Sequence, residues 1–222
     1  MERWVLLRKG ADFEAIGKKY QISPRLACLI RNRDVIGEEA VDRYLNGTIS
    51  DLYDGMLMKD MDKAIDILKE KILEDKKIRV IGDYDIDGVN ATYILLEGLE
   101  RLGADVDSDI PDRISDGYGL NRHLVERAYE AGVDTLITCD NGIVAADEIA
   151  YGKEMGMTVI VTDHHEVPFD EQDGEKRYRI PPADAVMDPK QPDCLYPFKG
   201  LCGAAVDGGI VGEYGKGFGG SG

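Results

Sequence analysis

Three short apolar runs, at residues 78–82, 134–139 and 158–162, are each followed by side chains that can bind metal ions. The residues that follow them are Asp83, Asp85 and Asp87, then Asp140, and then Asp163, His164 and His165. Carboxylate oxygens with an imidazole are ligands for Mn²⁺ or Mg²⁺ rather than for a metal that prefers thiolates. Two such cations held ~4 Å apart by a shared carboxylate can clamp a phosphate and generate hydroxide at neutral pH. The residue types therefore predict phosphodiester hydrolysis.

The elements that must position these side chains alternate between strand and helix. Apolar runs predict strands at 78–82, 105–110, 134–139 and 158–162, and helical patterns between them end at Gly103, Gly132 and Gly156. Strands joined by helical crossovers predict an α/β fold, a mainly parallel sheet with helices on both faces. The carboxyl ends of its strands face one crevice, so the three groups should converge there.

Each candidate also has an ordinary structural explanation. An Asp after a strand is commonly a helix cap or a turn former, and a single histidine is more often structural than a ligand. Three independent groups on one sheet edge, including two of the chain's three histidines, favour metal binding over these explanations. In the first group, alternate side chains of the Asp-x-Asp-x-Asp-Gly spacing leave the same side, and Gly88 allows a sharp turn.

The segments outside the alternating region are less regular. Residues 1–76 predict a small helical segment packed on the core, with Ser23-Pro24 starting one helix and an apolar stripe at helical spacing in another. That stripe consists of Met61, Ile65, Leu68 and Ile72. Residues 166–197 predict a loop-rich excursion with one short apolar piece at 183–187. Residues 207–222 hold eight glycines and predict a disordered tail after a catalytic domain at 77–206.

Composition limits the function further. The net charge of −16 counts against a protein that coats nucleic acid through bulk positive charge, and counts less against a nuclease whose carboxylates hold cations. The four cysteines form no Cys-x-x-Cys pair and predict reduced thiols in a cytoplasm. No segment approaches the ~20 apolar residues of a membrane span, so we expect a soluble protein without membrane partners.

Several motifs, in order and spacing, resemble the RecJ-like branch of the DHH phosphoesterase family over most of residues 1–206. The segments that carry the resemblance are VIGDYDIDG (80–88), IPDR (110–113), DGYGL (116–120), CDNG (139–142), TDHHE (162–166), DPK (188–190) and LCGAAV (201–206). The resemblance implies a Mn²⁺- or Mg²⁺-dependent 5′-to-3′ exonuclease on single-stranded DNA, with a role in DNA repair and recombination. It also implies single-strand-binding protein and a helicase as partners.

The resemblance assigns a role to each candidate. It implies metal ligation by Asp83, Asp85, Asp87, Asp140 and His164, with Asp140 bridging two ions. It implies that Asp163 orients the histidines, that His165 faces the scissile phosphate, and that Arg113 contacts a phosphate through its guanidinium. Together Asp87, Asp140, His164 and His165 form the expected catalytic group.

The chain departs from the family pattern after Val206. A further aspartate motif and a second domain, both expected from the family, are missing, so we expect a catalytic domain that is incomplete at its C-terminus. Asp207 lies among glycines without a strand to position it, and we do not expect it to replace the missing ligand. Two alternatives stay open: a relative that hydrolyses oligonucleotides or cyclic dinucleotides, and a non-catalytic nucleic-acid-binding scaffold. The Gly-Asp-Tyr-Asp form favours RecJ over the first, and retention of the aspartates and histidines argues against the second.

Overall fold

The computed structural model describes residues 9–112, 117, 119–172 and 174–218, and the chain divides into two compact units, 1–52 and 53–222. The first unit consists of α1 (Phe13–Tyr20), α2 (Pro24–Asn32), α3 (Glu38–Asn46) and the 3₁₀ turn η1 (Ile49–Asp51). As predicted, Ser23 caps α2, its hydroxyl accepting from Leu26 N, and Pro24 occupies the first turn.

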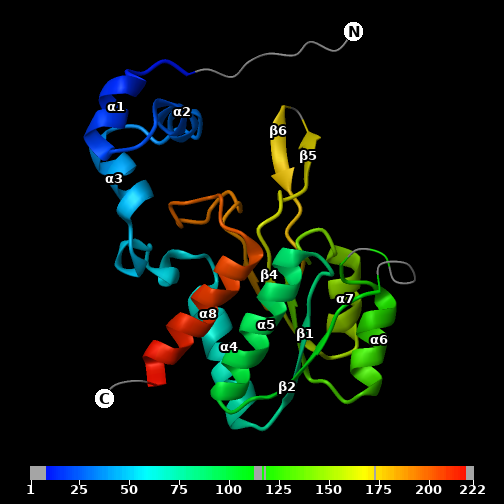
Figure 1. Ribbon diagram of the computed structural model, residues 1–222. Helices are drawn as coiled ribbons and strands as arrows, with labels where there is room; N and C mark the ends of the chain where they lie inside the picture. The colour runs from blue at the N-terminus through cyan, green and yellow to red at the C-terminus, as the bar shows by residue number, and fades with distance from the viewer. Residues whose placement is uncertain (1–8, 113–116, 118, 173, 219–222) are drawn as a thin grey trace. The chain divides into compact units, whose positions relative to one another are not determined.

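The second unit is built on a parallel sheet, which confirms the predicted fold class (Figure 1). Its strand order is β2-β1-β3-β4-β7, and all four pairings are parallel. The strands are β1 (Lys77–Ile81), β2 (Asp105–Asp109), β3 (Thr135–Cys139), β4 (Thr158–Thr162) and β7 (Ala185–Met187). The first four were predicted to within two residues at each end. A separate antiparallel hairpin joins β5 (Phe169–Gln172) to β6 (Glu175–Tyr178).

Helices cover both faces of this sheet because successive strand residues point to opposite sides. On one face, α4 (Met61–Leu73), α5 (Ile86–Arg101) and α8 (Gly203–Phe218) pack against Ile78 and Val80. On the other face, α6 (Arg122–Glu130) and α7 (Ala146–Glu154) pack against side chains such as Leu136 and Val159. Within the described residues, none of the helices is long and apolar enough to cross a membrane.

Two features of these segments differ from the sequence-based expectations. The helical segment does not extend as one body to residue 76, because α4 buries its apolar stripe in the core of the second unit. The apolar piece at 183–187 contains the edge strand β7, so the excursion after β4 returns to the sheet. The short η2 turn (Gly55–Leu57) precedes α4.

The prediction of a disordered tail is wrong for residues 207–218, which belong to α8. Val206, Ile210 and Tyr214 recur every four residues and are buried, so the glycines hide a genuine helical stripe. α8 packs closely on α5, where a Cβ added at Gly98 would lie 2.4 Å from a methyl group of Val211. Glycine, poor for an isolated helix, allows this close contact.

We predict opposite effects for two glycine-to-alanine changes within these helices. Gly98→Ala should lower the free energy of unfolding by about 1–3 kcal/mol, because overpacking against Val211 outweighs the gain in helix propensity. Gly208→Ala meets no atom within 4 Å and should instead stabilise α8 by up to about 1 kcal/mol. Urea unfolding of the chain measures both, and equal effects would contradict the described packing of α8.

Candidate metal centre

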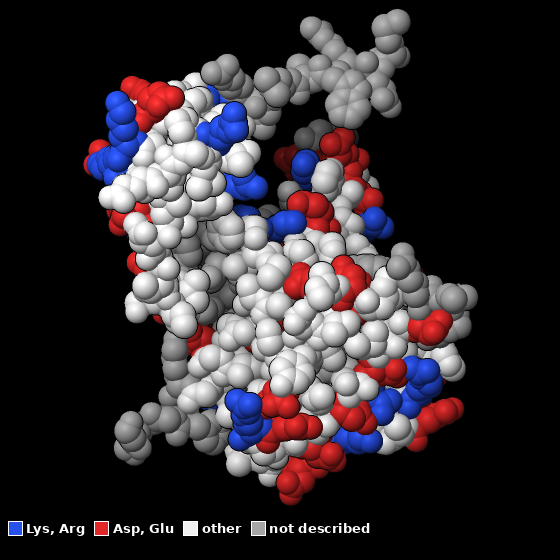
Figure 2. Space-filling model, in the orientation of Figure 1, with Lys and Arg blue, Asp and Glu red and all other residues white. Residues whose placement is uncertain are grey.

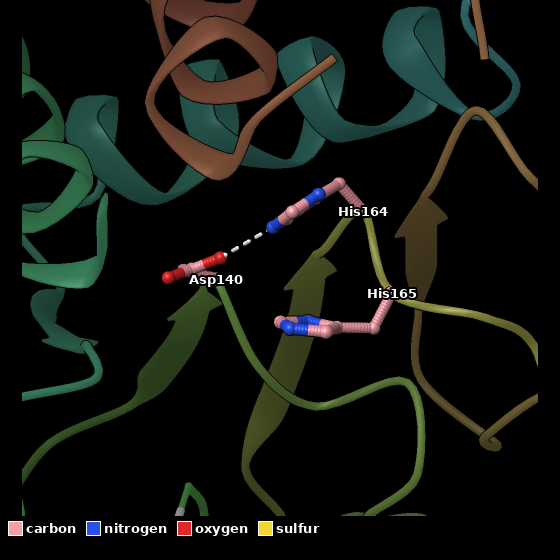
Figure 3. A group of neighbouring side chains, drawn as sticks. All are labelled: Asp140, His164 and His165. Atoms are coloured by element: carbon pink, nitrogen blue, oxygen red, sulfur yellow. Dashed lines mark ion pairs between the residues drawn. The ribbon is translucent and has the colours of Figure 1, made fainter. Parts of the chain in front are cut away.

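The three predicted groups meet at the carboxyl edge of the sheet. Asp83 follows β1, Asp140 follows β3, and Asp163, His164 and His165 follow β4, with β3 hydrogen-bonded between β1 and β4. Two sets of possible ligand atoms converge at this edge, and the atoms within each set all lie within 4.8 Å of one another. One set comes from Asp140, His164 and His165 (Figure 3). The other comes from Asp83, Asp85 and Asp140. Asp140 belongs to both sets.

Asp140 is held in place by a constrained turn. Its backbone lies in the left-handed region (φ 59°), which Asp and Asn tolerate better than most residues. The side-chain nitrogen Nδ2 of Asn141 donates to the carbonyl oxygens of Ile81 (3.0 Å) and Cys139 (2.9 Å), which joins the ends of β1 and β3. A Cβ at Gly203 would lie 2.8 Å from Cβ and Oδ1 of Asp140, so the start of α8 requires glycine here.

Two members of the first acidic group accept hydrogen bonds at the start of a helix. Asp85 caps α5, with Oδ1 accepting from the backbone nitrogens of Asp87 (2.8 Å) and Gly88 (3.0 Å). Asp87 accepts from the backbone nitrogens at the start of α8, from Gly203 N at 2.8 Å and Ala204 N at 3.0 Å. The structural explanation therefore applies to both, yet Asp85 still contributes an oxygen to a metal-sized cluster.

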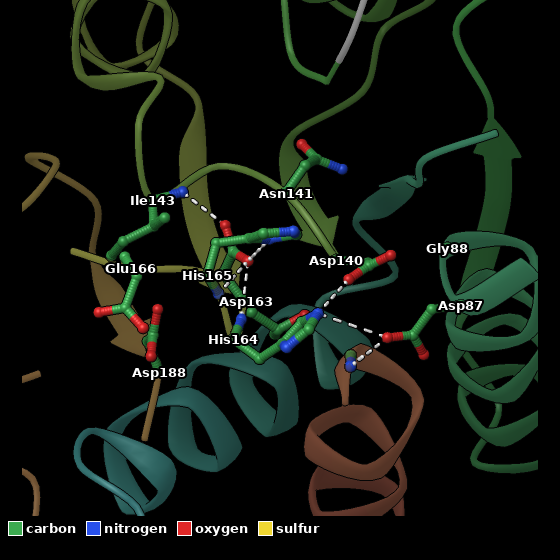
Figure 4. A network of polar contacts seen from close by, with 12 residues as sticks. Asp87, Gly88, Asp140, Asn141, Ile143, Asp163, His164, His165, Glu166 and Asp188 are labelled. Atoms are coloured by element: carbon green, nitrogen blue, oxygen red, sulfur yellow. Dashed lines mark hydrogen bonds and ion pairs between the residues drawn. The ribbon is translucent and has the colours of Figure 1, made fainter. Parts of the chain in front are cut away.

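His164 lies between two of these carboxylates. Its Nε2 is 2.9 Å from Asp140 Oδ1 and 3.4 Å from Asp87 Oδ2 (Figure 4). Burial and the neighbouring His165 lower the pKa of His164. The imidazole is then neutral near pH 7, as a metal ligand must be.

The Asp163 carboxylate forms hydrogen bonds to both histidines. Its Oδ1 accepts from the backbone nitrogens of His164 (2.7 Å) and His165 (3.1 Å), and its Oδ2 accepts from Ile143 N (2.9 Å). Burial disfavours ionisation, but hydrogen bonds from the His165 ring and from Ile143 outweigh it and lower the pKa of Asp163. Since the ionised carboxylate only accepts, Nδ1 of His165, 2.7 Å away, is the donor. This hydrogen bond raises the pKa of His165.

The electrostatics of the cluster suit a bound cation. Burial, together with the charges of Asp87 and Asp85, raises the pKa of Asp140 to about 7. The fold holds these carboxylates close together, and their mutual repulsion is an electrostatic cost that a bound divalent cation would remove. Oxygen ligands with one or two imidazoles match Mn²⁺ or Mg²⁺ in donor chemistry. The residues present therefore fit the predicted metals.

Asp188 was missed by the strand-end argument and shares the same edge. It directly follows β7, is fully buried, and accepts from Lys190 N through Oδ1 (2.7 Å). Burial raises its pKa to about 7, partly opposed by the Lys190 N–H. Reading 185–187 as a strand would have identified it, because the same rule applies to every strand end.

Asp207 lies within the described residues, whereas Arg113 does not. Asp207 is fully buried in α8, and burial raises its pKa well above the usual value, opposed in part by the adjacent Thr162 hydroxyl. The expectation that no regular element positions Asp207 is wrong, because the residue lies in α8. Neither set of converging ligand atoms includes it. Arg113, the predicted phosphate contact, lies outside the described residues.

Comparison with known proteins covers most of the chain. The single-stranded-DNA-specific exonuclease RecJ of Bacillus subtilis is 39% identical over 205 residues, 92% of this chain and 25% of that relative. RecJ of Escherichia coli is 30% identical, over 93% of this chain and 34% of the relative. The chain thus spans about a quarter to a third of the length of these curated relatives.

Solved structures and a family model agree with these relatives. A crystal structure of exonuclease RecJ bound to manganese has a TM-score of 0.62 at 36% identity, covering 73% of this chain and 39% of that one. RecJ in complex with Mn²⁺ from Thermus thermophilus has a TM-score of 0.64 at 29% identity, covering 98% and 29%. The model of the DHH family, N-terminal domain, matches residues 77–210, which is more than half of the chain. The chain therefore belongs to the DHH family.

Proposed function

We propose that this chain carries the metal centre of a single-strand-specific DNA exonuclease that works from the 5′ end. The observation that carries the proposal is the convergence of Asp140 with His164 and His165 on one side and with Asp83 and Asp85 on the other. The names of the relatives support the substrate, because they describe single-stranded-DNA-specific exonucleases. Two similar structures, both of RecJ with bound manganese, support the metal.

The proposed ligands are Asp83, Asp85, Asp87, Asp140 and His164. Asp140 is the shared ligand, since its carboxylate belongs to both converging sets. Bound Mn²⁺ or Mg²⁺ would supply Lewis acidity toward a phosphate oxygen and lower the pKa of water. The chain's own contribution is to hold these carboxylates at fixed positions after strand ends and at the start of α5, and to keep His164 neutral.

His165 is proposed to face the scissile phosphate. Asp163 fixes the ring by accepting from Nδ1 and raises the pKa of His165, which increases the protonated fraction near neutral pH. A protonated imidazole can donate a hydrogen bond to a phosphate oxygen and release a proton to a leaving oxygen. Arg113 stays a predicted phosphate contact, and a helicase, single-strand-binding protein and cytoplasmic location stay predictions.

The test is metal-dependent hydrolysis of a 5′-labelled single strand by this chain, with His164→Ala as the matched inactive variant. We expect mononucleotide release from the 5′ end in Mn²⁺, loss of activity with chelator, and little hydrolysis of a blunt duplex. Since replacing even the partners of metal ligands costs about 10–100-fold, His164→Ala should slow hydrolysis by at least about 100-fold.

Two results would contradict the proposal. Equal rates for the wild type and His164→Ala would show that the site performs no hydrolysis. Rapid hydrolysis of dinucleotides or cyclic dinucleotides with no action on longer strands would instead support the small-substrate alternative. A 3′-labelled strand serves as the polarity control.

A further inference from the structure

Lys190 is fixed to the same sheet edge as the proposed metal centre by the turn that follows β7. The buried Asp188 accepts from Lys190 N at 2.7 Å through its side chain and from Gln191 N at 3.2 Å through its carbonyl oxygen. β7 is hydrogen-bonded to β4, whose carboxyl end carries the two histidines. The backbone at Lys190 therefore has a defined position next to the site.

The Lys190 side chain pairs with the residue that follows the two histidines in sequence. Its Nζ is 3.1 Å from Oε1 of Glu166, the residue that follows His165. Burial and the charge of His165 lower the pKa of His164 most, and the positive charge of Lys190 adds a smaller decrease. The hydrogen bond to Asp163 raises the pKa of His165, and the charge of Lys190 opposes this rise. Figure 4 draws Glu166 and Asp188 together with the histidine network.

The pair between Lys190 and Glu166 is unequal. The Glu166 side chain is 88% exposed, whereas that of Lys190 is 26% exposed. An ion pair with an exposed carboxylate contributes little stability and exchanges readily with other partners. A phosphate that approaches the metal centre can thus replace Glu166 without disturbing buried structure.

The chain has few general means of attracting a polyanion. Its net charge is −16, and on the face drawn in Figure 2 basic side chains lie in small groups beside acidic ones. Individual cations placed at the site should then matter more than the bulk field.

We infer that Lys190 contacts a backbone phosphate of the bound nucleic-acid strand next to the one being hydrolysed, and that Glu166 occupies Lys190 when no strand is bound. The inference rests on the proposed function and adds a substrate contact to it. The lysine ammonium suits this role because it is a mobile point charge that needs no fixed bidentate geometry.

The two members of the pair should respond with opposite signs. Lys190→Gln should weaken strand binding, because it removes a phosphate contact. Glu166→Gln should tighten binding, because it removes the competing carboxylate and leaves Lys190 available. A purely structural ion pair predicts the same direction for both changes, since either one breaks it.

The experiment uses fluorescence anisotropy with a 5′-phosphorylated, non-hydrolysable phosphorothioate single strand in Mn²⁺ at several salt concentrations. For Lys190→Gln we expect several-fold weaker binding and a salt slope smaller by about 0.7, the value for one phosphate contact on a single strand. Lys190→Arg should restore both quantities. Thermal unfolding of each variant verifies that it is folded, and the Glu166→Gln result stands independently of Lys190→Gln.

Matched controls lie at the opposite, amino-terminal edge of the sheet. Lys153, at the end of α7, pairs with Asp184, which precedes β7, and its side chain is 32% exposed, similar to that of Lys190. Glu154 is the exposed neighbour of Lys153. Lys153→Gln and Glu154→Gln make the same charge changes and should leave strand affinity and salt slope unchanged.

Each outcome bears on one of two statements. If the wild type binds no strand in Mn²⁺, the proposed function and the Lys190 contact are overturned together. If the wild type binds and hydrolyses DNA while Lys190→Gln matches Lys153→Gln in affinity and slope, only the Lys190 contact is overturned. If Lys190→Gln and Glu166→Gln both weaken binding, the pair is structural and the inference is again overturned.

Discussion

Asp140→Asn is expected to reduce Mn²⁺ affinity by at least about 100-fold, a larger effect than replacement of a residue that only orients a ligand. Asn keeps the shape of the side chain and tolerates the left-handed backbone, so the change removes mainly the charge. That charge is shared by both sets of converging ligand atoms. Isothermal titration with Mn²⁺ measures affinity and stoichiometry, and unchanged values for both would refute the bridging role.

The same substitution should stabilise the metal-free chain. The folded-state pKa of Asp140 is about 7, above the unfolded value of about 3.9, so stability falls as pH rises from the lower value to the higher one. The amide that replaces the carboxyl does not titrate, so the variant has no such pH-dependent loss. In chelator, Asp140→Asn should therefore raise the unfolding temperature at pH 8, and much less at pH 4.

Asp134→Asn is the matched control at the other end of β3. Asp134 pairs with Lys71 at 2.7 Å, and although burial opposes it, this pairing helps to lower the pKa of Asp134. The control should leave Mn²⁺ binding unchanged and slightly lower stability above pH 5. A stability gain in both variants would mean that the effect reflects total charge rather than the crowding of carboxylates at the site.

Asp163→Ala is expected to be the most destabilising substitution at the site, by about 3–5 kcal/mol. The buried carboxylate accepts from three backbone nitrogens, those of Ile143, His164 and His165, and from the His165 ring. Alanine would leave these donors without their acceptor. Chemical unfolding of the metal-free chain gives the free energy, and Asp170→Ala on the exposed strand β5 serves as control.

The pH dependence of this effect follows from the lowered pKa of Asp163. The stability that the carboxylate contributes is fully present above its unfolded pKa of about 3.9 and is lost as pH falls through the lower folded-state pKa. The difference between wild type and Asp163→Ala should therefore be large at pH 7 and shrink in strong acid. A constant difference from pH 7 to pH 2 would show that the ionised form is not what stabilises the turn.

Much of the site was predictable because a parallel sheet brings its strand ends together. The positions of Asp83, Asp140 and His164 follow from three strong apolar runs and one topological rule, and the structure places all three at one edge. For Asp85 and Asp87 the sequence alone allows either capping or ligation. The structure shows that capping and proximity to the cluster coexist.

The features that escaped prediction depend on contacts between distant segments. β7 is three residues long and is a strand because β4 supplies its hydrogen-bonding partner, so its sequence alone gave too weak a signal for Asp188 to be included. α8 is rich in glycine, which disfavours helix locally. Its stability comes from Val206, Ile210 and Tyr214 buried against the sheet and neighbouring helices. In α8 the low intrinsic helix propensity of the sequence is therefore outweighed by tertiary packing.

Asp87 couples the stability of α8 to the cluster of carboxylates and histidines. The carboxylate that lies beside His164 also accepts the first backbone N–H groups of α8, across more than a hundred intervening residues. Whatever immobilises that carboxylate also protects the helix, and fraying of the helix releases the carboxylate, because thermodynamic coupling is reciprocal. Protease cleavage near Gly203 should therefore decrease when a metal ion binds at the carboxyl edge of the sheet.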